Sequence, residues 1–165
     1  MIPVFVYCLI LFELFTVAWI DFRTEKISNK WILVNLIGSV ILHLTLGSYY
    51  LLSWEIIIFP LGFILFGFLL FLINVMGAGD SKFLASLFLL IPLALHTLFF
   101  EKLVLATLVT GLILFLYRIA KNGSKLKAFL HSHHWQGVKE TLQSRFSYAP
   151  VILLAWLVLG AELWR

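Results

Sequence analysis

Two aspartates are the residues of this 165-residue chain that are best suited to chemistry. Asp21 and Asp80 are the only aspartates among the eight acidic residues. Two carboxyls brought close together cannot both ionise easily, so one proton is shared between them. Such a pair can activate a water as general base and protonate a leaving amine as general acid. Two unrelated carboxylates that mark helix ends fit the spacing equally well, so the elements that position them matter.

The composition is that of a membrane protein. Apolar residues make up 62% of the chain and charged residues 12%, with a mean hydropathy of +1.06. A soluble domain has about half apolar and about a quarter charged residues. This excess excludes a soluble globular enzyme and a disordered chain. We predict an all-α membrane protein, a polytopic bundle of about six transmembrane helices that forms a single domain over 1–165. The predicted spans are 2–20, 31–51, 55–74, 83–100, 102–120 and 146–164.

Only Glu101 and Lys102 separate the fourth and fifth predicted spans. A single helix over 83–119 would be about 55 Å long, far more than a bilayer needs, so we predict a tight hairpin at this pair. Segment 121–145 is the one sizeable polar stretch. We expect it to lie along the cytoplasmic interface, with Trp135 at headgroup depth.

Lysine and arginine residues gather on one predicted side of the membrane. Ten lie in or beside loops 21–30, 75–82 and 121–145, and two lie on the other side, which is a strong positive-inside pattern. These loops, and with them Asp21 and Asp80, should face the cytoplasm, and both termini should lie outside it. The net charge of +4 is explained by orientation in the bilayer, so no nucleic-acid partner is expected. The ten residues are Arg23, Lys26, Lys30, Lys82, Arg118, Lys121, Lys125, Lys127, Lys139 and Arg145.

The residues around Asp80 favour the catalytic interpretation. Asp80 follows Gly77, Ala78 and Gly79, and glycines let the backbone leave helical geometry and let another chain approach closely. Irregular backbone at membrane depth is tolerated where it is buried in protein or lines a wet cavity. A short turn between helices would also use glycine and aspartate.

Three segments, in order, resemble those of the type IV prepilin peptidases. Gly77-Ala78-Gly79-Asp80-Ser81-Lys82 resembles their GxGDxK motif. Segment 21–29, which begins at Asp21, is similar to the element that carries their other catalytic aspartate, with Ser28 where proline is usual. Segment 146–155 is similar to their C-terminal Ile-Pro-Phe-Gly-Pro type stretch, again with a serine in place of the first proline.

The resemblance implies a membrane aspartic endopeptidase that removes the short basic leader from prepilin-like or pseudopilin-like precursors at the cytoplasmic membrane face. It implies Asp21 and Asp80 as the catalytic dyad, no cofactor, and a multi-pass location in the inner (cytoplasmic) membrane. The short chain is similar to the peptidase-only form that serves tight-adherence pili or archaeal preflagellins, so no methyltransferase activity is expected. Two alternatives are a presenilin-like intramembrane protease and a non-enzymatic assembly factor or small transporter. The oligomeric state and the particular precursor stay open.

Several polar residues near the dyad have two interpretations. Gly77 and Gly79 could shape the loop or admit substrate, and Lys82 could hold the loop, contact the substrate or anchor a helix start. Asn29 could bond a loop carbonyl near Asp21 or cap the second span.

Glu13, three histidines and Cys8 are weaker candidates for a chemical role. Glu13 lies about 80° around the helix from Asp21, so we expect it to be protonated or internally paired and not a third catalytic acid. His131, His133 and His134 lack an acidic co-ligand, and we predict no metal site there. Cys8, the only cysteine, is expected to be a small buried apolar residue.

Overall fold

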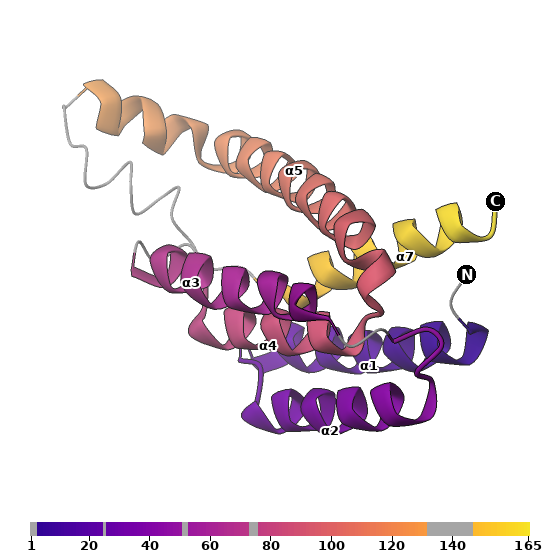
Figure 1. Cartoon of the computed structure of the whole chain (residues 1–165). Coiled ribbons are helices and arrows are strands. Elements are labelled where there is room, and N and C mark those ends of the chain that lie inside the picture. Colours follow the sequence, from indigo (N-terminus) through magenta and orange to yellow (C-terminus); the bar gives the residue numbers. More distant parts are fainter. Residues whose placement is uncertain (1–2, 25, 51–52, 73–75, 132–146) are drawn as a thin grey trace.

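The computed structural model describes residues 3–24, 26–50, 53–72, 76–131 and 147–165, and every regular element within these ranges is a helix. The predicted all-α fold is therefore confirmed. Figure 1 shows the helices in chain order. They are α1 (Val4–Thr24), α2 (Asn29–Thr45), α3 (Ile58–Leu72) after the 3₁₀ turn η1 (Trp54–Ile57), α4 (Ala78–Leu90), the 3₁₀ turn η2 (Leu93–Leu95), α5 (His96–His131) and α7 (Ala149–Leu163).

Helix α4 is the central element of the packing. It lies against α2 and α3, while α7 lies against α1 and α5. Figure 1 shows α1, α2, α3 and α4 side by side, with α5 leaving this group at an angle. Both termini lie at the same end of the group, so the last turn of α1 and the first turn of α4 lie at the other end (Figure 1).

Aromatic side chains fill the interior between the helices. Trp156 on α7 is fully buried, stacks on Tyr7 of α1 with ring centroids 5.2 Å apart, and meets the edge of Phe99 of α5 at 5.5 Å. Phe88 of α4 packs against Phe99 at 5.3 Å. These contacts link α1, α4, α5 and α7, because large buried aromatics contribute much of the apolar area in a core.

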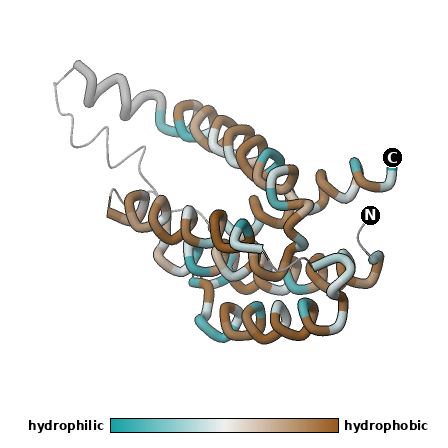
Figure 2. Tube along the Cα trace, viewed as in Figure 1, coloured by the Kyte–Doolittle hydropathy of each residue, from teal (hydrophilic) through white to brown (hydrophobic). Residues whose placement is uncertain are grey.

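The outer surface is apolar and the interior holds polar groups. Helix α3 exposes Leu65, Phe66 and Phe68 by 59% or more, and Figure 2 shows apolar residues along almost the whole length of the helices. A soluble protein would not expose such a surface, whereas hydrocarbon is its natural solvent. The buried polar residues are Glu13, Asp21, Asn35, Ser39, Ser81, Ser86 and His96.

Among the described residues, two helical stretches are long and apolar enough to cross a membrane, Val4–Thr24 and Leu93–Asn122. Trp54–Leu69 and Ala149–Leu163 are apolar but shorter. Length, composition and the apolar exterior together suggest a membrane location.

The predicted hairpin at Glu101 and Lys102 is wrong, because the chain breaks ten residues earlier. Helix α4 ends at Leu90, and the next residue, Ile91, has extended backbone (φ −82°, ψ 136°) before Pro92. Proline disfavours helical geometry in the residue before it and cannot donate within a helix, so the break falls here. Lys102 lies inside α5 and forms an ion pair with Glu162 of α7, which offsets the cost of placing a charge in an apolar helix.

The expectation of a polar loop over 121–145 is only partly met. Helix α5 continues to His131, with a kink at Asn122 where the backbone leaves helical values (φ −113°, ψ 17°). Trp135 and the rest of that segment lie outside the described residues.

Candidate active site

The two aspartates come to the same end of the helix group. Asp21 is in the last turn of α1 and is 2% exposed, and Asp80 is in the first turn of α4. Burial, and then the negative charge of Asp21, raise the pKa of Asp80 to about 6, while the Gly77 N–H opposes this rise. A carboxylate raises the pKa of another carboxyl in this way only at short range, so the two acids lie near each other. Residues 59 positions apart in the chain thus form one acidic pair.

Asp21 is held by the segment that leads into α7. Its Oδ2 accepts a hydrogen bond of 2.5 Å from the Ser147 hydroxyl and one of 3.2 Å from the backbone N–H of Ala149. Sequence reasoning missed both contacts, since they join residues more than 120 positions apart. The similarity of segment 146–155 to a family element was the available signal, but it carried no information about a partner.

Asp80 is fixed by its own helix start. Its Oδ2 accepts from the Gly77 N–H at 3.1 Å, while the Asp80 N–H donates to the Gly77 carbonyl at 3.1 Å. This reciprocal pair satisfies two backbone groups that a helix N-terminus would otherwise leave without partners. A Cβ on Gly77 would lie 3.0 Å from Asp80 Oδ2, so glycine leaves the room that the carboxylate uses.

Gly79 serves the fold of this chain, because it lies inside α4 and faces the loop between α1 and α2. A Cβ on Gly79 would lie 3.3 Å from the Ile27 carbonyl oxygen, which is tighter than most real contacts. The close approach that the sequence suggested is thus made by the protein itself. It brings the loop after Asp21 against the helix that carries Asp80.

Lys82 and Asn29 are the other two residues that the sequence placed near the acidic pair. Lys82 is exposed, and the one ion pair found among the described residues joins Lys102 and Glu162. The proposal that Asn29 caps the second span is wrong, because Ser28 is the N-cap of α2 and accepts from the Lys30 N–H at 3.3 Å. A serine side chain in extended geometry reaches the second backbone N–H of the helix well.

Glu13 has internal partners away from the pair. It is 5% exposed on α1 and faces Asn35 of α2, which is fully buried. With the amide nitrogen of Asn35 directed at the carboxyl, Asn35 donates to both Glu13 oxygens, at 3.0 Å to Oε2, and its oxygen accepts from Ser86 Oγ at 3.0 Å. The structure therefore shows the internal pairing expected for Glu13, and the chain of contacts links α1, α2 and α4.

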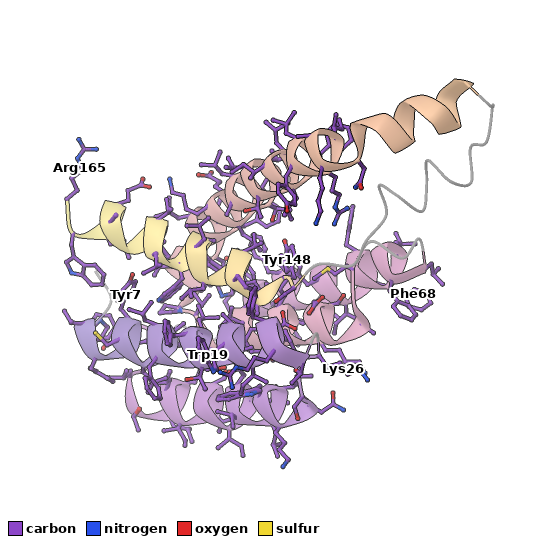
Figure 3. All side chains as sticks on the ribbon, turned by 180° about the vertical axis from the view of Figure 1, so that it is seen from behind. Tyr7, Trp19, Lys26, Phe68, Tyr148 and Arg165 are labelled. Carbon is purple, nitrogen blue, oxygen red and sulfur yellow. The ribbon has the colours of Figure 1, made fainter. Side chains whose placement is uncertain are left out.

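Tyr148 lies beside the acidic pair. Its hydroxyl is 2.7 Å from Thr107 Oγ1 of α5, and it is within electrostatic reach of Asp80. Figure 3 shows Tyr148 between the helices, with Lys26 and Phe68 toward one end of the molecule and Arg165 at the other.

Within the part of the chain that the structure describes, no group of three or more His, Cys, Asp or Glu side chains is placed to hold a metal ion. Of the predicted histidine cluster, the backbone of His131 ends α5, and His133 and His134 lie outside that part. The absence of a metal site there stays a prediction. Cys8 is exposed on α1 and not buried as expected.

The arrangement defines an all-helical, membrane-type protein with two carboxyls at one end. The type IV leader peptidase family matches residues 8–119, and this chain belongs to that family. The matched region contains Asp21, Asp80 and the segment Gly77–Lys82, and it ends before the segment that binds Asp21. No curated protein and no solved structure matches the chain significantly.

Proposed function

We propose that this protein is an aspartic endopeptidase that removes the short basic leader from type IV prepilin-like precursors, with Asp21 and Asp80 as its dyad. The observation that carries the proposal is that Asp21 and Asp80 lie at the same end of the helix group, within electrostatic reach of each other and within the family-matched region. Family membership gives the peptidase class, and the pair supplies groups that can perform hydrolysis without a covalent intermediate.

The surroundings of the two carboxyls give them different roles in hydrolysis. Two donors on Asp21 Oδ2 suit a carboxylate, so Asp21 takes a proton from the attacking water. Asp80, whose pKa is raised, holds the shared proton and donates it to the carbonyl oxygen. The water oxygen bonds to the carbonyl carbon to give a tetrahedral diol. As the C–N bond breaks, the leaving amine receives the proton that Asp21 had taken, and the former carbonyl oxygen returns its proton to Asp80, which restores the starting pair.

We propose that α1, α2, α3, α4, α5 and α7 cross the inner membrane, with the dyad at the cytoplasmic face. Helix α4, with 13 residues, is about 20 Å long and shorter than the hydrocarbon core. Nearly all of its residues from Ser81 to Leu90 are buried by neighbouring helices, so protein and not lipid surrounds it. A short helix that starts with a polar turn is tolerated there, and water can reach Asp80 from the membrane face.

Leader removal from a co-expressed precursor tests the proposal. Mass spectrometry of a prepilin-like protein, expressed with and without this chain, should show loss of the leader only when the chain is present. A precursor that keeps its leader in both cases contradicts the proposal. A cut inside the precursor's apolar helix favours a presenilin-like protease.

We expect activity to fall as the pH rises through about 6. The sign follows from the raised pKa of Asp80, because the protonated form that donates to the carbonyl is present below this pH and is lost above it. The measurement is the pH dependence of kcat/KM for the detergent-solubilised protein with purified precursor. An activity that keeps increasing well above this pH would assign the proton to another group.

Thiol labelling tests the orientation, with the two ends of α2 as a matched pair. Lys26 and Ser48 are both exposed and flank this helix. In a Cys8→Ala background, a reagent that cannot cross the membrane should label the Ser48→Cys variant in intact cells and spare Lys26→Cys, because basic loops stay in the cytoplasm. Permeabilised cells should label both variants. The reverse pattern in intact cells would place the dyad outside the cytoplasm.

A further inference from the structure

Within the described part of the chain, the segment before α7 makes the shortest hydrogen bond to the dyad. Ser147 Oγ donates to Asp21 Oδ2 at 2.5 Å, a length in the range of charge-assisted O–H···O⁻ bonds. The Ala149 N–H donates to the same oxygen at 3.2 Å. Among the described residues no donor contacts Asp21 Oδ1, so both protein donors occupy one oxygen and leave the other to the water.

Only one of the two donors depends on the identity of the side chain. The Ala149 N–H belongs to the first turn of α7, whose N–H groups have no partner within the helix, so any residue other than proline could supply it. The Ser147 hydroxyl depends on the side chain, and proline, which occupies the corresponding position in the similar family segments, cannot make this bond. Ser147 is therefore a feature of this chain that lies outside the family-matched region.

We propose that Ser147 is a positioning residue that orients Asp21 toward the attacking water and keeps the negative charge of the pair on Asp21. The proposal rests on the assignment of Asp21 and Asp80 as the dyad. With Oδ2 held by two donors, Oδ1 is directed to the water, and the shared proton is left on Asp80. Without the hydroxyl, the carboxyl of Asp21 rotates more freely and the proton divides between both groups.

The neighbouring contacts fix Ser147 itself. Ala149 is fully buried, and the Tyr148 hydroxyl bonds to Thr107 of α5 at 2.7 Å, so the residues after Ser147 are held on two sides. A hydroxyl on so constrained a segment can orient a carboxylate, because little freedom remains to be lost when the bond forms.

The test compares Ser147→Ala and Ser147→Thr in the full-length, detergent-solubilised protein with a purified prepilin-like precursor. Ser147→Ala should lower kcat by about ten- to a hundredfold, the effect of losing a hydrogen bond to a charged group, while KM changes by less than about threefold. Threonine retains the hydroxyl and should restore most of kcat. Ser53→Ala, which removes an exposed hydroxyl at η1, is the matched control and should match the parent protein.

Several outcomes would overturn this role. They are an unchanged kcat in Ser147→Ala, a loss that appears mainly in KM, and a loss that threonine does not restore. The same experiment includes Asp21→Asn. If Asp21→Asn cleaves the precursor normally, the dyad is wrong and the proposed function fails; if it is inactive while Ser147→Ala is normal, only the positioning role fails.

Discussion

Asp21→Asn and Asp80→Asn should each lower leader cleavage by at least about a hundredfold, because asparagine cannot accept or donate the proton that hydrolysis moves. Both variants should still fold. The asparagine oxygen can accept from Ser147 and Ala149 at position 21, and from the Gly77 N–H at position 80. The measurement is the fraction of precursor that is processed in cells with equal amounts of each variant in the membrane.

Glu13→Gln is the matched control for this result. Glu13 lies on the same helix as Asp21 and is buried, but its partner is Asn35, which in turn accepts from Ser86. Glutamine keeps the shape and hydrogen-bonding capacity, so substantial activity should remain. Normal processing by either aspartate variant would refute the dyad, and loss in Glu13→Gln as complete as in the aspartate variants would bring Glu13 into the site.

Gly67→Val should destabilise the protein and impair the site, whereas Gly62→Val on the same helix should do neither. A Cβ on Gly67 would overlap the side chain of Ser81 and lie 3.3 Å from its Cα, whereas a Cβ on Gly62 meets nothing within 4 Å. Overpacking costs about 1–3 kcal/mol, and here it pushes α3 away from α4 next to Asp80. Both substitutions place valine in α3, so helix propensity cancels in the comparison.

The measurements for this pair are the thermal midpoint in detergent and the rate of leader cleavage. We expect the midpoint and the rate to fall together in Gly67→Val. Equal behaviour of the two variants would mean that α3 and α4 do not approach as closely as the structure shows.

Sequence alone predicted what depends on local composition. Apolar runs indicated a helical membrane protein, and the Gly77–Lys82 motif indicated Asp80, because both signals lie within a few residues. The break between α4 and α5 was misplaced because the prediction rested on two charged residues within an apolar stretch. Glu101 and Lys102 indicated a loop, but an ion pair with Glu162 lets Lys102 stay in a helix. Pro92 was the local signal that could have corrected this.

Contacts between distant segments were the part that sequence could not predict. Nothing near Asp21 indicates that Ser147 binds it, since the contact depends on how α7 packs against α1. The same holds for Gly79, whose spacing suggested room for a substrate. The room is taken by Ile27, because the loop after α1 folds back on α4.

The position of α7 sets the smallest unit that can work. A chain cut after residue 119, where the family match ends, would keep both acids and all of the family motif. It would lose Ser147 and Ala149, which hold Asp21, and Trp156, which fills the space between α1 and α5. If Asp21 is the base that we propose, such a fragment would carry the family motif without the groups that orient that base, and its interior would lack the side chain that closes it.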